Sequence, residues 1–365
     1  MRGKIEYASN AGTRIYSELI MNFLKVILYP LIPVYAFIIW LRNYLFDKNV
    51  FKTRSVNAKV FSVGNISFGG SGKTPVTIYL TGLLKHGEFK VGVLSRGYGR
   101  KSSGYVFVSD GQKFLTTVDK SGDEIYHTVL DCSVPAAVSE NRVKGAERLI
   151  NDTGVNAIVL DDAFQHRWIK RDVDLLVIDQ RFLTEKSIFI NNLLPTGVMR
   201  EPLSSIKRAD AIIINRKFME KKDISDEFNR YFEGKNIFTG FYKAISFFDL
   251  KHNTELSLKE FQGQKSLVVS GIATPFSFLN ILRQSKVDTQ NKLIFKDHKR
   301  YSYDDVQRIR QLFYSTNSHS VVTTEKDAVK LTKFSREMDD IDIYYLKIKF
   351  SLDDEEAFKG FIFKV

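Results

Sequence analysis

A glycine-rich turn between an apolar segment and a helical one limits the possible folds of this chain more than any other feature. Residues 63–75 read VGNISFGGSGKTP, in which Gly69, Gly70 and Gly72 directly precede a Lys-Thr pair and Gly64 lies upstream. Glycines allow the backbone to turn its N–H groups inward around phosphate oxygens, and a helix that begins at such a turn adds partial positive charge. The pattern predicts an α/β protein that contains a phosphate-binding loop (P-loop).

The loop departs at one position from the usual spacing G-x-x-x-x-G-K-[ST], because Ser67 stands where that pattern has its first glycine. A chance glycine turn therefore stays the alternative. In the P-loop interpretation, Lys73 reaches the β- and γ-phosphates of ATP and Thr74 places its hydroxyl on Mg²⁺. The residues predicted to bind the nucleotide are Ser67, Phe68, Gly69, Gly70, Ser71, Gly72, Lys73 and Thr74.

Short apolar segments alternate with helical ones after residue 54, which is typical of parallel sheets covered on both faces. The expected strands are 59–63, 91–95, 157–160, 175–178 and 211–214, with helices at 74–84 and 141–150. A second, smaller series has strands at 266–269 and 321–323 and helices at 275–285 and 303–315. The pattern predicts two α/β/α domains, a P-loop domain over 55–235 and a smaller one over 236–365.

A metal ion beside a P-loop needs a carboxylate from the end of another strand. Residues 155–162 (VNAIVLDD) form a buried run that ends in two carboxylates. Asp161 and Asp162 are therefore predicted Mg²⁺ ligands, although adjacent aspartates at strand ends are also common as ordinary loop residues. The chain has no Asn-Lys-x-Asp string, which GTPases use to recognise guanine, and this argues against a GTPase.

The segment 26–41 (VILYPLIPVYAFIIWL) is uncharged and mostly apolar. As a helix it is ~24 Å long, short of the ~30 Å hydrocarbon core of a bilayer. We expect a membrane-associated helix and linker over 21–54, kinked at Pro30 and Pro33, with a buried core helix as the alternative. Basic residues follow the segment, so the downstream domains are expected on the cytoplasmic side. Residues 1–20 are polar and read as an extension or an alternative start.

Charge and composition leave several classes of function open. Lys and Arg number 54 against 42 Asp and Glu, a formal charge of +12, which suits a phosphorylated or anionic partner. A lipid-sugar kinase, a membrane-tethered ATPase and a non-enzymatic basic protein all fit that charge. Nucleic acid is not expected as a partner, because the aromatic residues gather in apolar runs such as 23–46. One cysteine excludes an internal disulfide.

Several further strings, in order along the chain, resemble the tetraacyldisaccharide 4′-kinase family of lipid A biosynthesis. Besides the loop, they are LSRGYGR at 94–100, GDE at 122–124, NR at 141–142, DDAFQH at 161–166, RD at 171–172, LPTGVMREP at 194–202, GIATP at 271–275, DH at 297–298 and TTEKDA at 323–328. The resemblance covers nearly the whole chain from Met21. It departs at Ala163, where the family usually has glycine, and at Ile125, where it often has proline.

The resemblance implies transfer of the γ-phosphoryl group of ATP to the 4′-hydroxyl of a tetraacyldisaccharide 1-phosphate, giving lipid IVA, with Mg²⁺ as cofactor. It implies two domains across a cleft and an N-terminal helix docked on the inner membrane, whose anionic lipids are a further partner. Asp123 matches the family's general base and His298 the histidine paired with it. With Lys73, these are the predicted catalytic residues.

Further residues are weaker predictions. Thr74 and Glu201 join Asp161 and Asp162 as candidate metal ligands. The candidates for the substrate side or for phosphate charge are Glu124, Gln165, His166, Arg96, Arg142 and Arg171.

Overall fold

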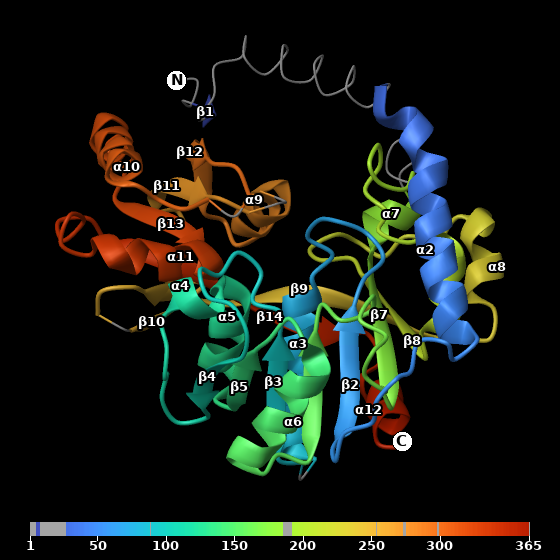
Figure 1. The fold of residues 1–365 in the computed structure, drawn as a ribbon. Coiled ribbons are helices and arrows are strands. Elements are labelled where there is room, and N and C mark those ends of the chain that lie inside the picture. The colour runs from blue at the N-terminus through green and yellow to red at the C-terminus, as the bar shows by residue number, and fades with distance from the viewer. Residues whose placement is uncertain are drawn as a thin grey trace. The chain divides into compact units, whose positions relative to one another are not determined.

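The computed structural model describes residues 5–7, 27–87, 89–184, 192–252, 254–272, 275–297 and 299–364. The chain divides into two compact units, one formed by 22–241 with 350–365 and the other by 1–21 with 242–349. The chain passes from one unit to the other within two strands, β9 (Asn236–Asp249) and β14 (Ile343–Leu352). An α/β protein with a mostly parallel sheet is confirmed (Figure 1).

The larger unit is built on a parallel sheet in the order β9-β8-β7-β2-β6-β3-β5, with β4 added antiparallel at the edge. Its further strands are β2 (Lys59–Gly64), β3 (Val91–Ser95), β4 (Val106–Asp110), β5 (Pro135–Val138), β6 (Ala157–Asp161), β7 (Val173–Asp179) and β8 (Ala211–Asn215). Five of these strands, β2, β3, β6, β7 and β8, overlap the strands expected from the sequence. Strands β4, β5 and β9 were not expected.

Helices cover both faces of this sheet. They are α2 (Ile32–Asp47), α3 (Lys73–His86), α4 (Val118–Ser121), α5 (Asp123–Cys132), α6 (Arg142–Thr153), α7 (Gln180–Thr184), α8 (Asn229–Phe232) and α12 (Glu355–Ile362), with 3₁₀ turns at Tyr29–Leu31, Leu203–Arg208 and Asp226–Phe228. Alternate residues of a strand point to opposite faces. On β2 and β6, Val60 and Ile158 pack with Leu149 of α6, whereas Asp161 points to Thr77 of α3. Strands β2 and β6 therefore lie between α3 on one face of the sheet and α6 on the other.

The C-terminal residues belong to the larger unit, whereas the sequence prediction placed all of 236–365 in the smaller domain. The cause is aromatic packing. The ring of Phe358 on α12 lies 4.9 Å from that of Phe238 and 6.0 Å from that of Tyr79, measured between centroids. The predicted boundary lies after residue 235, directly before β9, whereas the observed one lies after Phe241, within β9.

The smaller unit has its own parallel sheet in the order β1-β12-β11-β13-β14. Its elements are β1 (Ile5–Tyr7), β10 (Glu255–Ser257), β11 (Lys265–Ser270), α9 (Pro275–Gln284), β12 (Asp288–Ile294), α10 (Tyr303–Ser315), β13 (Ser320–Thr324), α11 (Glu325–Leu331) and a 3₁₀ turn at Thr332–Phe334. Side chains of β11, β12, β13 and α10 form its core. Strand β1 lies within the segment 1–20 and pairs with β12.

The N-terminal apolar segment forms a 3₁₀ turn at Tyr29–Leu31, which contains Pro30, followed by α2, whose second residue is Pro33. The change of helix type therefore falls at Pro30, whereas Pro33 lies within the first turn of α2. Among the residues that the structure describes, no helix is long and apolar enough to cross a membrane. The last turns of α2 pack on the larger unit, because Phe46 is buried and its ring lies 4.8 Å from that of Trp168.

Candidate active site

The glycine loop connects β2 to α3. Gly69 and Gly72 have φ values of 106° and 90°, a region that L side chains rarely adopt. A Cβ on Gly64 would lie 2.5 Å from the backbone nitrogen of Phe164, so the end of β2 closely approaches the segment that follows β6. The backbone path therefore requires glycine at these three positions.

Two buried asparagines hold the loop. Asn65 Nδ2 donates to Ser71 Oγ at 2.9 Å, and Asn215 Nδ2 donates to the carbonyl oxygen of Ser71 at 3.0 Å. The loop is also paired with a later segment, since the N–H of Phe68 donates to the carbonyl oxygen of Val198 at 2.6 Å. Sequence reasoning missed Asn215, and the available signal was a polar residue that ends the apolar run of β8.

Lys73, the first residue of α3, faces the acidic pair after β6. Its Nζ lies 3.6 Å from Asp162 Oδ1, and Arg200 Nη1 lies 2.9 Å from the same oxygen. Burial opposes the ionisation of Asp162, but Lys73 and Arg200 outweigh it and keep its pKa below the ordinary value. Asp162 is thus an anion held between two cations. Sequence reasoning missed Arg200, which directly precedes the predicted Glu201.

Asp161 is the more deeply buried carboxylate. Its Oδ1 accepts a hydrogen bond of 3.1 Å from Thr77 Oγ1, whereas its Oδ2 has no hydrogen-bond partner among the described residues. Burial, followed by the charges of Glu124 and Asp162, raises the pKa of Asp161 to about 7. Burial therefore favours the protonated form of Asp161, and an added positive charge beside it would favour the ionised form. Sequence reasoning missed Thr77, which lies one helical turn after Lys73 on the same face of α3.

The start of α5 lies on the same side of the sheet. Gly122 has a φ of 91°, and a Cβ there would lie 3.0 Å from the carbonyl oxygen of Tyr98, so α5 begins against the loop after β3. Because Glu124 raises the pKa of Asp161, the first turn of α5 lies near the end of β6. Asp123 is the first residue of that turn. Its predicted partner, His298, lies outside the described residues.

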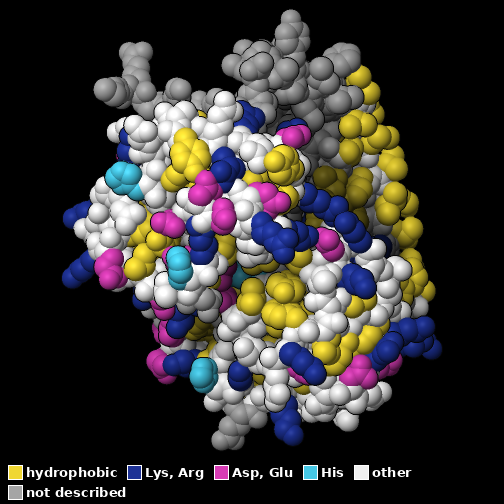
Figure 2. Space-filling view, turned by 90° about the vertical axis from the view of Figure 1, so that its left-hand side faces the viewer, with side chains coloured by type: hydrophobic (Ala, Val, Ile, Leu, Met, Phe, Trp, Pro, Cys, Tyr) yellow, Lys and Arg dark blue, Asp and Glu magenta, His cyan; other side chains and the backbone are white. Residues whose placement is uncertain are grey.

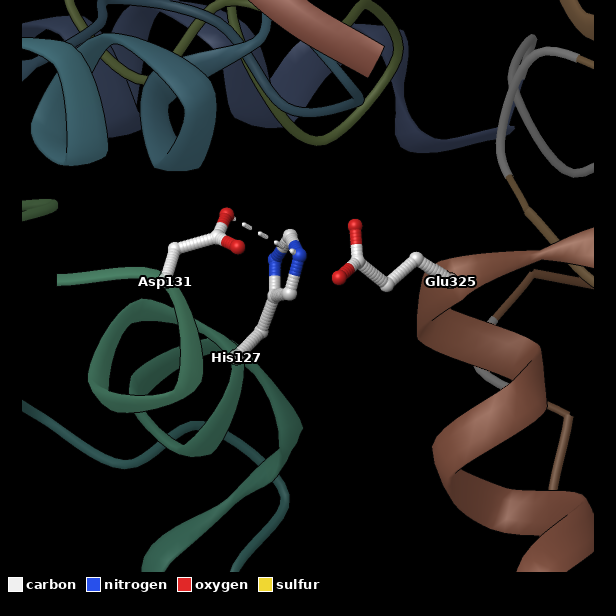
Figure 3. A group of neighbouring side chains, drawn as sticks. All are labelled: His127, Asp131 and Glu325. Carbon is white, nitrogen blue, oxygen red and sulfur yellow. Dashed lines mark ion pairs between the residues drawn. The ribbon is translucent and has the colours of Figure 1, made fainter. Parts of the chain in front are cut away.

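The next turns of α5 carry a further pair that the sequence did not indicate. His127 Nε2 lies 3.6 Å from Asp131 Oδ2, and Figure 3 shows this contact as a dashed line. An i, i+4 pair of this kind stabilises a helix.

Glu201 does not fit its predicted role as a metal ligand. Its side chain is fully buried, and its Oε2 lies 2.8 Å from Arg208 Nη2 and 3.2 Å from Asn43 Nδ2. Arg42 Nη1 is 3.8 Å from its other oxygen. The carboxylate therefore compensates two arginines and anchors α2. A sequence that shows only an acidic residue beside Arg200 does not reveal those distant partners.

The three predicted phosphate arginines differ in their surroundings. Arg171 is committed to the protein, because its Nη2 lies 3.1 Å from Asp174 Oδ2 and its Nη1 donates to the carbonyl oxygen of Ala163 at 3.1 Å. Arg142 is buried, and burial lowers its pKa to about 10. It donates to the carbonyl oxygen of Ser139. Arg96 is exposed just after β3, where it stays available to a ligand.

Gln165 and His166 connect this region to α2. Gln165 Nε2 donates to the carbonyl oxygen of Asn65 at 2.7 Å, and its own carbonyl oxygen accepts from Arg42. Burial, followed by the charge of Arg142 and its neighbours, lowers the pKa of His166 to about 4. His166 is therefore a neutral imidazole near pH ~7.

Comparisons with known proteins agree with this arrangement. A family model described as Tetraacyldisaccharide-1-P 4′-kinase matches residues 24–365. The chain belongs to this family. It is 37% identical to the tetraacyldisaccharide 4′-kinase of Halothermothrix orenii, with 96% of each chain covered. It is 35% identical to that of Phocaeicola vulgatus, with 91% of this chain and 93% of the relative covered.

A solved structure shares the fold. The crystal structure of LpxK from Aquifex aeolicus in complex with ATP has a TM-score of 0.77 and is 31% identical, over 93% of this chain and 99% of that one. The predicted family is thereby confirmed, as is the predicted activity, that of an ATP-dependent tetraacyldisaccharide 4′-kinase. Members of this family act in lipid A biosynthesis.

Proposed function

We propose that this chain transfers the γ-phosphoryl group of ATP to the 4′-hydroxyl of a tetraacyldisaccharide 1-phosphate at the carboxyl ends of β2, β3 and β6. The observation that carries the proposal is the 3.6 Å contact between Lys73 and Asp162. It joins the two parts that phosphoryl transfer needs, a cation for the phosphates and a carboxylate for a metal ion. Glycine geometry alone does not distinguish a phosphate loop from an ordinary turn.

The nucleotide phosphates would occupy the loop 67–74. The left-handed glycines Gly69 and Gly72 shape it, and α3 offers its unpaired N–H groups at Lys73 and Thr74. Lys73 would exchange its contact with Asp162 for the γ-phosphoryl oxygens. Such a charge stabilises the transition state, where negative charge spreads over the transferred group.

The acidic pair fits Mg²⁺. The buried Asp161 Oδ2 lacks a hydrogen-bond partner among the described residues, and Asp162 is ionised. Carboxylate and hydroxyl oxygens are the ligands that Mg²⁺ uses, so Asp161, Asp162 and Thr74 are the residues that would hold it. When bound, the ion neutralises charge on the β- and γ-phosphates. Glu201 is not in this set, because its carboxylate already forms ion pairs with Arg208 and Arg42.

The acceptor hydroxyl needs a base, since a sugar alcohol is a weak nucleophile near neutral pH. Asp123 stands at the start of α5, beside the loop after β3 and near the end of β6. We assign it the role of accepting the 4′-hydroxyl proton. His298 remains the predicted partner that orients or tunes Asp123.

The lipid acceptor implies a membrane surface. Helix α2 and the turn before it expose large apolar side chains, among them Phe37 at 57% and Trp40 at 56%. Figure 2 shows hydrophobic side chains in a band along its right-hand edge. Since α2 also contacts Gln165 and Glu201, a membrane on this face would deliver lipid close to the site. We propose docking on the inner membrane from the cytoplasmic side, with anionic lipids attracted by the basic surface.

A comparison of ATP consumption with and without acceptor tests this proposal. Purified protein in neutral detergent with Mg²⁺ is expected to consume ATP only when tetraacyldisaccharide 1-phosphate is added, one ATP per lipid phosphorylated. Equal ATP consumption without lipid would contradict the proposal and favour the membrane-tethered ATPase.

A further inference from the structure

A cavity of about 470 Å³, lined by described residues of the larger unit, lies outside the nucleotide loop. We infer that it is an anion subsite that binds the 1-phosphate of the acceptor lipid. Its walls come from the linker after α2, from the start of α6 and from the segment after β6. This inference rests on the proposed function for the identity of the acceptor, and it assigns a different phosphate from the one that Lys73 contacts.

The cavity carries uncompensated positive charge. Lys52, Arg54 and Lys144 line it, and none of their side chains forms an ion pair or hydrogen bond with another described residue. One acidic residue, Glu140, also lines it. The carboxylate of Glu140 forms an ion pair with Arg100 and also accepts a hydrogen bond of 3.0 Å from the N–H of Gly104. The net charge of the lining side chains therefore suits a phosphate dianion.

The positive groups stand on a fixed backbone. The N–H of Arg54 donates to the carbonyl oxygen of Trp168 at 2.9 Å, and the carbonyl oxygen of Arg54 accepts from the N–H of Lys170 at 2.8 Å. Lys144 lies in the first turn of α6, whose N-cap residue Asn141 also lines the cavity. The start of this twelve-residue helix adds partial positive charge on the same side.

His166 adds a neutral side chain to the lining of the cavity. Its Nε2 is buried and has no hydrogen-bond partner among the described residues. It lines the cavity together with Trp168, whose side chain is 40% exposed. A bound phosphate could lie between the cationic side chains, while the sugar ring that carries it packs against the indole of Trp168.

The position of the cavity favours the acceptor over ATP. No residue of the loop 67–74 lines it, so the nucleotide phosphates have a separate place. The segment 161–168 connects the two places, with the metal carboxylates at its start and His166 and Trp168 at its end. A disaccharide that carries its reacting hydroxyl on one sugar and its phosphate on the other would span such a segment.

The test compares two acceptors, tetraacyldisaccharide with and without the 1-phosphate, in neutral detergent. The double variant Arg54→Ala/Lys144→Ala is expected to raise KM for the phosphorylated acceptor about tenfold or more, because each lost charged contact weakens binding. With the acceptor that lacks the phosphate, the same variant is expected to lie within about twofold of wild type. Lys113→Ala, an exposed lysine outside the cavity, is the charge-matched control.

Equal losses with both acceptors would overturn the subsite, since the charges would then act on something other than the phosphate. The phosphate that binds in the cavity could also be the headgroup of a membrane phospholipid, and binding to vesicles of anionic phospholipid tests this alternative. If the variant loses vesicle binding while its KM in neutral detergent is unchanged, the cavity holds a membrane headgroup and the inference is wrong. If wild-type protein phosphorylates neither acceptor, the proposed function fails instead.

Discussion

The ammonium nitrogen of Lys73 lies 3.6 Å from the carboxylate oxygen Oδ1 of Asp162. Lys73 begins α3 after the glycine loop, and Asp162 follows β6, so the contact joins the ends of two neighbouring parallel strands. Because Arg200 shares that carboxylate, release of Lys73 toward a phosphate would not leave Asp162 unpaired.

Lys73→Ala is expected to lower kcat about a thousandfold, because the lost charge stabilises the transition state more than the bound ground state. Steady-state kinetics with saturating lipid measures it. Lys85→Ala is the matched control, since Lys85 lies at the other end of α3 and donates to the carbonyl oxygen of Cys132 at 3.0 Å. Unchanged turnover in Lys73→Ala would remove the phosphate-loop assignment.

Asp161→Asn is expected to abolish activity and yet stabilise the protein without metal. The pKa of Asp161, raised to about 7, favours the protonated form in the folded state. The stability due to this group is therefore present below the ordinary carboxyl pKa of about 4 and is lost as the pH rises to about 7. Thermal unfolding in EDTA between about pH 4 and 8 measures the slope. The decrease of stability with rising pH is expected to be smaller in Asp161→Asn and unchanged in Asp172→Asn. An unchanged decrease in both variants would show that burial does not raise the pKa of Asp161.

Glu201→Gln separates a structural role from a metal role. If the carboxylate compensates Arg208 and Arg42, its loss leaves buried charges unpaired and lowers the free energy of unfolding by about 3–5 kcal/mol. The Mg²⁺ concentration for half-maximal activity is expected to stay unchanged. Urea unfolding and Mg²⁺ titration measure the two quantities, with the exposed Glu227→Gln as control. A shifted Mg²⁺ dependence with normal stability would restore the metal role.

Asp123→Asn is expected to lower kcat by about 10²–10⁴ with little change in the KM for ATP, since it removes a base rather than a nucleotide contact. Asp131→Asn, on the same helix but paired with His127, is expected to retain activity. A double-mutant cycle with His298→Ala tests the predicted partnership. Losses that simply add would show that His298 is not coupled to Asp123.

The exposed face of α2 is expected to determine membrane binding. Phe37→Ser/Trp40→Ser removes apolar area from that face and leaves the buried Phe46 in place. We expect a severalfold smaller fraction bound to anionic vesicles, with the remainder sensitive to salt. Phe276→Ser, a 66% exposed aromatic on α9, is the control. Equal binding by wild type and the α2 variant would place the anchor elsewhere.

Local pattern was sufficient for features that lie along one stretch of chain. The glycine loop, the carboxylates after β6 and the strand-helix alternation could all be predicted, because period, glycine and charge are local signals. Ser67, where the usual pattern has its first glycine, pairs through its backbone with Met199 in a β-bridge, and this extended pairing does not require glycine.

Roles that depend on distant contacts could not be predicted. Glu201 reads as a free acid in sequence, and only the fold brings Arg208 and α2 to it. Arg171 likewise reads as a phosphate ligand, yet it supports the loop after β6 through Asp174 and backbone carbonyls. The return of 350–365 to the larger unit depends on the packing of Phe358, which has no signal in the local sequence.

Transfer of label from γ-labelled ATP to the lipid tests the central claim most directly. Protein, Mg²⁺ and tetraacyldisaccharide 1-phosphate in neutral detergent are incubated and extracted, and the position of the new phosphate is determined. We predict label in the lipid at the 4′-oxygen with wild type, and almost none with Lys73→Ala or Asp123→Asn. Label found only as inorganic phosphate, or lipid labelled equally by all three proteins, would contradict the account.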